Sequence, residues 1–387
     1  MLKKIAVVFG TRPEAIKLAP VIKAIGEQSE LFEPLIISTG QHREMLAQVL
    51  EIFGIRPHID LHVMKDNQDL IDVTSRIIRS LNVVFKEEKP DFVVVQGDTT
   101  TTFAASLVAF YNRIPVGHVE AGLRTYNKCS PFPEEINRQL TTVLSDLHFA
   151  PTRKAHENLI HCGVQRDKII LTGNTVIDAL HYYLSMNERN SNLRDETGCM
   201  RRILVTAHRR ENFGEPIRNI CLAIRDIVQM RNDIEFIYPV HLNPNIQVPV
   251  HELLDGMERV SLIPSQTYFE FLRLMRSSYM ILSDSGGVQE EAPSLGKPVL
   301  VLRDTSERME AVEAGAVKLV GTDRNAIVEE TVALLDDPLA YAAMANAGNP
   351  FGDGLASSRI VDSIRHFFGM GAYPEEFHFQ RGSNNAE

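Results

Sequence analysis

Short apolar runs rich in β-branched residues recur along the chain, and they constrain the fold more than any other feature of the sequence. Continuous runs of this kind are typical of parallel strands buried on both faces of a sheet. The segments between them, such as 68–89, 216–231 and 326–337, show helical periodicity, so the alternation predicts an α/β protein. The runs form two series: 5–11, 34–40, 92–99, 116–122, 147–152 and 169–175, then 203–209, 235–241, 259–264, 280–286, 299–304 and 317–323.

Each series predicts one Rossmann-like, doubly wound domain, and we expect the two domains to face a cleft. A length of 387 residues suits this organisation. The expected domains are 1–178 and 179–355, and the polar, weakly periodic stretch 180–201 is the expected linker between the two series. Residues 370–387 are poor in aliphatic side chains and predict a flexible tail.

Charge and cysteine content exclude several classes of protein. Forty Lys and Arg against fifty Asp and Glu give a net charge of −10, which argues against a nucleic-acid or membrane-surface binder. No apolar run approaches the ~20 residues that span a bilayer, and the N-terminus lacks a signal peptide. Four scattered cysteines and the absence of a zinc-spaced His cluster predict reduced thiols without a metal, hence a cytoplasmic protein: Cys129, Cys162, Cys199 and Cys221.

The first apolar run leads into GTRPEAIK (10–17), a turn that opens a helix. Pro13 suits an early helical position. Arg12 and Lys17 then lie near a helix N-terminus, where an anion binds favourably. Solvated surface charge is the alternative interpretation.

Acidic residues follow three segments of the first half. Asp98 ends an apolar run in QGDTTTT (96–102), where it could instead cap the next helix. Glu120 ends the next run in GHVEAGLRT (117–125), and Glu134 with Glu135 follows two prolines in SPFPEEINR (130–138). Because strand ends meet at one edge of a parallel sheet, these carboxylates can converge and move protons at a weakly acidic carbon.

The second half supplies cationic and hydrogen-bonding groups. His208, Arg209 and Arg210 follow a strand and predict a diphosphate site, although a lone histidine is more often structural. In SDSGGVQEEAPSLGKPVLVLRDTSER (283–308), two glycines let a phosphate approach the backbone at a helix N-terminus. Glu290 and Glu291 follow one turn later, where an acidic side chain can accept hydrogen bonds from the hydroxyls of a ribose. The alternative interpretation, a plain βα turn, does not explain these two acidic residues. No GxGxxG motif is present, so the sequence gives no sign of a bound nicotinamide dinucleotide or other cofactor.

Together these residues resemble the bacterial non-hydrolysing UDP-N-acetylglucosamine 2-epimerases. The resemblance covers about nine-tenths of the chain and implies a glycosyltransferase-B arrangement, with a last helix at about 356–369 packing back on the first domain. The matching motifs occur in order: GTRPEAIK, QHREML (41–46), GDTTTT, GHVEAGLRT, TGNTVIDAL (172–180), HRREN (208–212), YPVHLNP (238–244), the 283–305 segment and NPFGDG (349–354).

The resemblance implies roles for individual residues. Asp98, Glu120 and Glu134 look like the acid/base set, and His208 would act at the diphosphate. Glu291 would take the ribose, and Gln266 and Phe271 would flank the uracil. The remaining contacts to UDP or phosphate would be Arg12, Lys17, Ser285, Gly286, Gly287 and Arg308.

Many relatives also bind a second UDP-N-acetylglucosamine as an activator. The matching residues here are Gln41, His42, Glu134, Arg209 and Arg210. Tyr126 replaces a more usual Gly and Asn67 stands where some relatives have Arg, departures that concern the activator site and not the chemistry.

The resemblance predicts a homodimeric enzyme that needs no cofactor. It would interconvert UDP-N-acetylglucosamine and UDP-N-acetylmannosamine by eliminating UDP to give 2-acetamidoglucal and adding it back, supplying surface polysaccharide synthesis. Three alternatives remain: a hydrolysing epimerase, a glycosyltransferase on the same fold, and an inactive nucleotide-sugar sensor.

Overall fold

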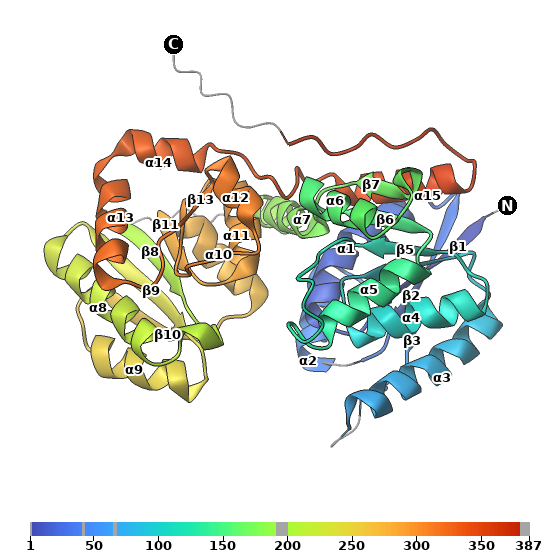
Figure 1. The fold of residues 1–387 in the computed structure, drawn as a ribbon, viewed down its shortest axis with the longest axis horizontal. Helices are drawn as coiled ribbons and strands as arrows, with labels where there is room; N and C mark the ends of the chain where they lie inside the picture. The colour runs from blue at the N-terminus through green and yellow to red at the C-terminus, as the bar shows by residue number, and fades with distance from the viewer. Residues whose placement is uncertain (1, 41–42, 65–67, 191–199, 380–387) are drawn as a thin grey trace, which may run out of the picture. The chain divides into compact units, whose positions relative to one another are not determined.

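The structure, a computed structural model, describes residues 2–40, 43–64, 68–190 and 200–379, without the side chains of 43–45 and 187–190. It divides into two units, each built on one parallel sheet covered by helices (Figure 1). Unit 1 comprises residues 1–182 and 352–378. Unit 2 comprises residues 183–351.

The sheet of unit 1 has the strand order β3-β2-β1-β4-β5-β6-β7. Its strands are β1 (Lys3–Phe9), β2 (Phe32–Ser38), β3 (Ile59–Asp60), β4 (Phe92–Gln96), β5 (Val116–Val119), β6 (Leu147–Ala150) and β7 (Ile169–Leu171). Its helices are α1 (Arg12–Glu27), α2 (Arg43–Ile52), α3 (Leu70–Glu88), α4 (Thr100–Tyr111), α5 (Glu134–Leu144), α6 (Arg153–His161), η1 (Arg166–Lys168) and α15 (Ala356–Phe367). Helix α7 (Thr175–Asn190) runs across the boundary between the units.

The sheet of unit 2 has the strand order β10-β9-β8-β11-β12-β13. Its strands are β8 (Arg201–Thr206), β9 (Ile234–Val240), β10 (Val260–Pro264), β11 (Met280–Ser283), β12 (Val299–Val301) and β13 (Val317–Leu319). Its helices are η2 (Arg210–Asn212), α8 (Glu215–Met230), α9 (Pro244–Leu254), α10 (Tyr268–Ser277), α11 (Gly286–Glu291), η3 (Ala292–Leu295), α12 (Met309–Ala314), α13 (Arg324–Asp336) and α14 (Pro338–Ala345).

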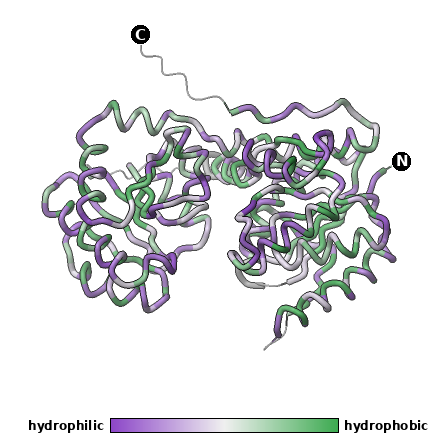
Figure 2. Tube along the Cα trace, in the orientation of Figure 1, coloured by the Kyte–Doolittle hydropathy of each residue, from purple (hydrophilic) through white to green (hydrophobic). Residues whose placement is uncertain are grey.

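Burial of both sheet faces explains why the central strands are apolar. All five residues of β4 and all four of β5 are buried. Val8 and Val95 pack with Ile77 of α3 and Ala105 of α4 in one core, while Val205 and Phe236 pack with Ile224 of α8 in the core of unit 2. The hydropathy pattern shows the same apolar strands within more polar helices (Figure 2). The predicted pair of parallel α/β sheets is confirmed.

Both sheets contain a point where the strand order reverses, and ligands of such sheets bind at the carboxyl ends of the strands beside it. In unit 1 this point lies between the parallel neighbours β1 and β4. In unit 2 it lies between β8 and β11. The loops after these four strands are therefore the places where each unit can build a ligand site.

Three local features differ in detail from the sequence expectations. The two-residue strand β3 has no counterpart among the predicted runs. The stretch expected as a linker begins as helix, because α7 continues to Asn190. Residues 370–378, the first part of the segment expected to be a flexible tail, belong to unit 1: the Phe377 amide donates to the Leu171 carbonyl of edge strand β7 at 2.7 Å, and Phe377 is 4% exposed.

Helix α15 belongs to unit 1 through polar contacts at its first turn. The carboxylate of Asp178 in α7 accepts the Ser357 amide at 2.7 Å and the Ser357 hydroxyl at 2.6 Å. Arg359 donates to the Thr172 carbonyl after β7 at 3.1 Å. A carboxylate at a helix N-terminus satisfies amides that lack intrahelical partners.

Candidate functional site

The turn from β1 into α1 is built around Glu14, to which the sequence analysis gave no role. Its carboxylate accepts the Gly10 amide at 3.1 Å and the Thr11 amide at 2.7 Å, and it also accepts the Thr99 hydroxyl at 2.7 Å. Glu14 is 1% exposed, and burial raises its pKa. One side chain thus joins the loops at the ends of β1 and β4. The Thr-x-x-Glu spacing of a capping box was the signal for it.

Glu120 follows β5 and is held by three donors. Its Oε1 lies 2.5 Å from Lys17 Nζ and accepts the Asn174 amide at 3.1 Å, while Gln96 donates to Oε2. The Glu120 side chain is 8% exposed, and its backbone has a φ of 62°, rare for a non-glycine residue. Such conformations cluster at functional sites, where surrounding contacts impose them. Lys17, which the resemblance assigns to phosphate, contacts the carboxylate here.

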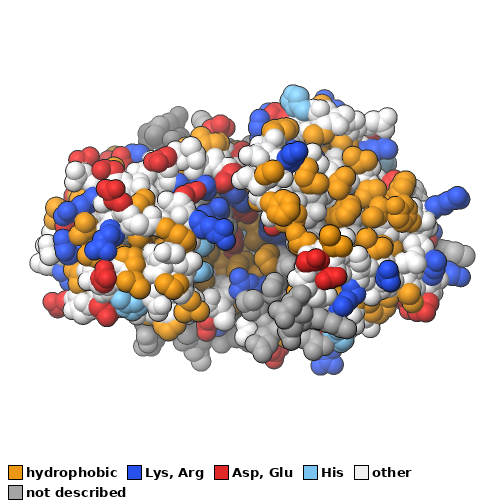
Figure 3. All heavy atoms as spheres, turned by 60° about the horizontal axis from the view of Figure 1, so that its bottom comes forward, with side chains coloured by type: hydrophobic (Ala, Val, Ile, Leu, Met, Phe, Trp, Pro, Cys, Tyr) orange, Lys and Arg blue, Asp and Glu red, His pale blue; other side chains and the backbone are white. Residues whose placement is uncertain are grey.

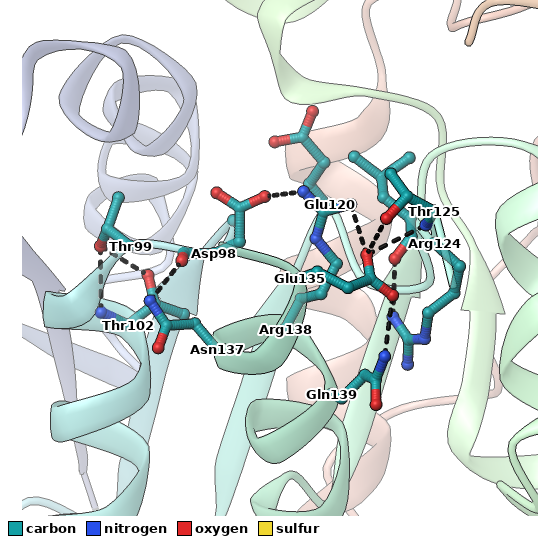
Figure 4. Close-up of polar contacts among 12 residues, drawn as sticks. Asp98, Thr99, Thr102, Glu120, Arg124, Thr125, Glu135, Asn137, Arg138 and Gln139 are labelled. Carbon is teal, nitrogen blue, oxygen red and sulfur yellow. Dashed lines mark hydrogen bonds and ion pairs between the residues drawn. The ribbon is translucent and has the colours of Figure 1, made fainter. Parts of the chain in front are cut away.

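Asp98 follows β4 in a turn where Gly97 has a φ of 75°. Its Oδ2 lies 2.5 Å from Nη2 of Arg138, and its carbonyl accepts the Asn137 amide at 3.0 Å (Figure 4). The capping alternative for Asp98 does not hold, because Thr99 is the N-cap of α4 and accepts the Thr102 amide. The Asp98 side chain stays 26% exposed, which leaves it open to a ligand.

The two glutamates at the start of α5 have different surroundings. Glu135 is fully buried and accepts the Thr125 and Tyr126 amides at 3.0 and 3.1 Å. Glu134 is half-buried, and its side chain forms no hydrogen bond or ion pair within the described ranges. Glu135 is therefore a structural carboxylate, whereas Glu134 is available for other contacts.

The other residues that the first half of the sequence offered for the site have separate surroundings. Arg12 is half-buried at the first position of α1, and it forms no ion pair with a described residue. The Tyr126 hydroxyl donates to Asn158 at 3.0 Å. Gln41, His42 and Asn67 lie outside the described residues.

In unit 2, the loops after β8 and β11 meet at Asp284. This carboxylate is 0% exposed, and its Oδ2 accepts the His208 amide at 2.7 Å, the Arg209 amide at 2.8 Å and the Asn212 side chain at 2.9 Å. Its Oδ1 lies 3.5 Å from His208 Nδ1 and has no other partner among the described residues. Asp284 therefore fixes the backbone at His208 as well as facing its ring.

The His208 ring stacks on His241, with centroids 5.6 Å apart. Burial lowers the pKa of His208, and nearby His241 and Arg209 act in the same direction, while Asp284 opposes them. The ring remains partly exposed, so it can present Nε2 to a ligand. Asp284, Asn212 and His241 were not identified from the sequence.

The Ser285-Gly286-Gly287 turn opens the short helix α11. A Cβ at Gly286 would lie 2.7 Å from Cζ of Arg308, so only glycine lets this guanidinium approach. Arg308 Nε donates to Glu290 at 2.9 Å, and Glu291 accepts the Tyr268 hydroxyl at 2.7 Å. The two acidic residues therefore have different partners: Glu290 pairs with a cation, and Glu291 accepts from a tyrosine.

Other second-half candidates lie on the surrounding loops and on α10. Gln266 donates to the Pro264 carbonyl at 2.7 Å, and Phe271 is half-buried in α10. Arg209 and Arg210 follow His208 at the start of η2. Across the described ranges, no group of three or more His, Cys, Asp or Glu could hold a metal ion. No described helix is long and apolar enough to cross a membrane.

Each unit therefore supplies different chemistry in the loops that follow its strands. Unit 1 presents two carboxylates, Asp98 and Glu120, each in an ion pair with a basic side chain. Unit 2 presents His208 with Asp284, and Arg308 beside Gly286. Paired carboxylates are suited to proton transfer, and the second set to an anionic ligand.

Comparison with known proteins gives one consistent family. The UDP-N-acetylglucosamine 2-epimerase of Escherichia coli K12 is 51% identical over 371 residues, which cover 94% of this chain and 98% of the relative. The crystal structure of UDP-GlcNAc 2-epimerase from Neisseria meningitidis bound to UDP-GlcNAc superposes with a TM-score of 0.83 at 51% identity, covering 94% of this chain and all of that one. A Listeria monocytogenes structure matches with a TM-score of 0.92 at 47% identity, covering 98% and 100%.

A more distant likeness concerns the fold alone. The glycosyltransferase of kitacinnamycin shares 12% identity with a TM-score of 0.65, covering 95% of this chain and 99% of that one. The expected glycosyltransferase-B-like pair of α/β domains is thereby confirmed. Because the UDP-N-acetylglucosamine 2-epimerase family model matches residues 23–365, and because relatives are about half identical over nearly the whole chain, the protein belongs to the UDP-N-acetylglucosamine 2-epimerase family.

Proposed function

We propose that the protein interconverts UDP-N-acetylglucosamine and UDP-N-acetylmannosamine without net hydrolysis. The observation that carries this is the pair Asp98 and Glu120 after neighbouring parallel strands, each beside a cation. Carboxylates in such surroundings can exchange protons with a substrate carbon. Membership of the epimerase family supplies the substrate class.

The proposed route is elimination of UDP followed by its return. Carbon 2 of the sugar carries an acetamido group and no neighbouring carbonyl, so its hydrogen is too weakly acidic for simple removal. A carboxylate takes that proton as the bond from carbon 1 to the diphosphate oxygen breaks, the electron pair leaves with UDP, and 2-acetamidoglucal forms. A proton is then delivered to the opposite face of carbon 2, and UDP oxygen re-forms the bond to carbon 1. The sequence balances without a redox cofactor.

The residues of the two units divide this work. Asp98, Glu120 and Glu134 are proposed to carry protons, and His208 to stabilise the charge that develops on the departing diphosphate. Glu291 would accept from the ribose, with Gln266 and Phe271 at the uracil. The proposed diphosphate contacts are Arg12, Lys17, Ser285, Gly286, Gly287 and Arg308.

A deuterium experiment tests the reaction. The protein is incubated with UDP-N-acetylglucosamine alone in D2O and followed by NMR. We expect deuterium at carbon 2 and a mixture of both UDP sugars. Free N-acetylmannosamine would point to a hydrolysing enzyme, and no exchange would contradict both readings.

A variant pair links the reaction to the carboxylates. Glu120→Gln should lower the exchange rate by at least about 100-fold, since an amide cannot take up the proton, while UDP affinity stays nearly the same. Glu51→Gln, on the exposed side of α2, is the matched control and should exchange at the wild-type rate.

The cellular setting is also proposed. The product would supply surface polysaccharide synthesis in the cytoplasm. Thiols stay reduced there, and Cys129, Cys162 and Cys221 are free cysteines.

A second UDP-N-acetylglucosamine is proposed to bind as an activator. The residues proposed to contact it are Gln41, His42, Glu134, Arg209 and Arg210. A sigmoidal dependence of rate on substrate in the NMR assay supports that contact, and a hyperbolic one opposes it.

We further propose a homodimer formed through the outer face of α4 and α5. This α4–α5 face consists of Phe103, Leu107, Phe110, Tyr111, Ile136, Leu140 and Val143, and α4 contains no charged residue. Phe110, Tyr111 and Val143 are 58%, 69% and 82% exposed. Neighbouring exposed apolar side chains of this kind are a feature of protein interfaces.

A second copy of the chain is the partner that suits this face. Two copies with a net charge of −10 repel one another, and an uncharged contact surface adds no further repulsion. A helix stripe without charge can pack on its own copy about a two-fold axis. Figure 3 shows hydrophobic side chains gathered on the unit that carries α4 and α5.

A further inference from the structure

Arg138 of α5 lies between two carboxylates. Its Nη2 is 2.5 Å from Asp98 Oδ2, and its Nη1 is 3.4 Å from Glu135 Oε2. The Arg138 side chain is 11% exposed and that of Glu135 is 0% exposed, whereas Asp98 reaches the surface. In Figure 4 the guanidinium extends from α5 toward the Asp98 carboxylate, on the side where Glu120 also lies. The structure thus joins a surface carboxylate to a buried one through a single cation.

Glu135 remains charged whatever happens at Asp98. Burial opposes ionisation of Glu135, but its hydrogen bonds from Thr125 and Gln139 and the charge of Arg138 outweigh burial and lower its pKa. Besides two backbone amides, the carboxylate accepts the Gln139 side chain at 2.8 Å. A carboxylate with this many donors stays ionised through the neutral pH range.

This second negative charge matters because a buried arginine cannot be left unpaired without a large cost. If Asp98 were the only partner of Arg138, every protonation of Asp98 would leave a buried cation uncompensated. With Glu135 present, Arg138 keeps one ion pair while Asp98 changes its charge. The geometry therefore permits Asp98 to take up a proton without losing its neighbour.

Asn137, the residue before Arg138, fixes the backbone at the same place. Its side-chain amide donates to the Asp98 carbonyl at 3.0 Å, and Asn137 is 8% exposed. Adjacent residues of α5 thus hold both the main chain and the side chain of Asp98. One helix turn sets the direction in which the carboxylate points.

We propose that Arg138 is a positioning residue for the epimerisation, one that orients Asp98 while Glu135 holds Arg138 in place during proton transfer. The inference rests on the proposed function, in which Asp98 carries a proton. Arg138 acts through Asp98 and is not itself assigned a contact with substrate. Arginine is needed for this arrangement because its planar fork can face two carboxylates at once.

A double-mutant cycle tests the proposal with the full-length protein. Arg138→Met, Asp98→Asn and the double variant are compared by kcat and KM for UDP-N-acetylglucosamine. Arg138→Met should lower kcat about 10- to 100-fold with KM changed less than about threefold, since the group affected acts after binding. In the Asp98→Asn background the same substitution should change kcat by less than about twofold. Arg138→Lys should recover part of the lost kcat, because it restores the charge without the fork.

Two further variants separate orientation from general stability. Arg79→Met, on the exposed side of α3, is the matched control and should keep the wild-type kcat and Tm. Glu135→Gln removes the permanent counter-charge and should lower kcat although Arg138 and Asp98 are both intact. If Arg138→Met does not fold, the cycle is run with Arg138→Lys, for which we expect a smaller fall in kcat and the same dependence on Asp98.

The outcomes distinguish the proposed function of Asp98 from the positioning role of Arg138. Full activity in Asp98→Asn contradicts the proposed function itself. Low activity in Asp98→Asn together with wild-type kcat in Arg138→Met overturns only the role of Arg138. Independent, multiplying losses in the double variant also overturn it, because they mean that Arg138 does not act through Asp98.

Discussion

Asp98 and Glu120 show how individual contacts prepare a carboxylate for proton transfer. Lys17 and Arg138 each place a cation 2.5 Å from one of them. Each of these ion pairs holds its carboxylate in one orientation. Glu120 is nearly enclosed and Asp98 is more exposed, with side chains 8% and 26% exposed. The two carboxylates thus have different access to solvent, which suits different roles in a two-step proton transfer.

Asp284 performs a comparable task for His208. One of its oxygens accepts two backbone amides of the loop and the Asn212 side chain, and the other faces the ring at 3.5 Å. A carboxylate beside one ring nitrogen determines which nitrogen carries the proton. His208 is therefore oriented from a strand end 76 residues away in the sequence.

Replacing this carboxylate gives a residue-scale prediction. Asp284→Asn keeps an oxygen for the loop but removes the charge, so kcat should fall about 10- to 100-fold, as for other groups that orient a functional histidine. Because Asp284 raises the pKa of His208 against burial, His241 and Arg209, the pKa of His208 should decrease further. Steady-state kinetics and an NMR titration of the His208 ring measure the two effects.

The chain offers a matched pair for this comparison. Asp255 lies 3.5 Å from His251 Nδ1, at the same separation, but its side chain is 70% exposed. Asp255→Asn should leave kcat unchanged. An Asp284→Asn variant with normal kcat and an unshifted His208 would refute the orienting role.

At the scale of elements, neighbouring strands β5 and β6 place two buried histidines opposite one another. His118 pairs in register with His148, and they are 0% and 1% exposed. Burial, with smaller effects from nearby cations, lowers the pKa of His118 to about 3 and that of His148 to about 4. Both rings are thus neutral in the folded protein at moderately acidic pH. His118 lies on β5, the strand that leads to Glu120.

These histidines make stability depend on pH. Unfolded histidine titrates near pH 6.5, so between pH 6.5 and about 4 the unfolded chain binds protons that the folded chain excludes. The free energy of unfolding therefore decreases as the pH is lowered through this range. When the pH is lowered from 6.5 to 5.5, each of these histidines should reduce the free energy of unfolding by about 1 kcal/mol. His148→Gln should reduce the loss of unfolding free energy over this interval by that amount, as measured by urea denaturation with circular dichroism.

The control for this measurement is an exposed histidine. His161→Gln, on α6, should show the same loss between pH 6.5 and 5.5 as the wild type. An unchanged loss in His148→Gln would mean that the ring is protonated in the folded state.

At the scale of the whole molecule, each unit has its own sheet, core and switch point. Their chemistry differs because the loops after the strands differ, while the strand patterns are alike. Unit 1 also carries the α4–α5 face. Helix α5 connects that face to the site, because its outer side bears Leu140 and its inner side bears Arg138.

The assembly gives the corresponding prediction. Leu140→Glu places a charge in each copy of the α4–α5 face, where it would be buried beside apolar residues, so the dissociation constant of the dimer should rise at least about 100-fold. Sedimentation velocity at micromolar concentration should show a shift from dimer to monomer. Leu339→Glu, on α14 of unit 2 at a leucine 82% exposed, should not change the sedimentation. A monomeric wild-type protein, or a dimeric Leu140→Glu variant, would contradict the proposed interface.

The strands were predictable because burial on both sheet faces requires continuous apolar runs. Every long strand of the two sheets coincides with such a run, whereas β3 has only Ile59 and Asp60 and leaves no comparable pattern. The sequence pattern also allowed Asp98 and Glu120 to be predicted as site residues, since a charged residue directly after a buried strand is unusual. The family resemblance rested on the same loop motifs and is confirmed.

The partners of those residues came only from the tertiary structure. Lys17 meets Glu120 across 103 residues of sequence, and Arg138 meets Asp98 across 40. Such pairs depend on which strands are neighbours and on how a helix turns above them, and neither is encoded in a local pattern. The sequence alone determined two α/β domains and the positions of their polar strand ends, because burial acts on every residue locally. Only the folded arrangement decided which cation faces which carboxylate, because an ion pair requires two distant side chains to share one place.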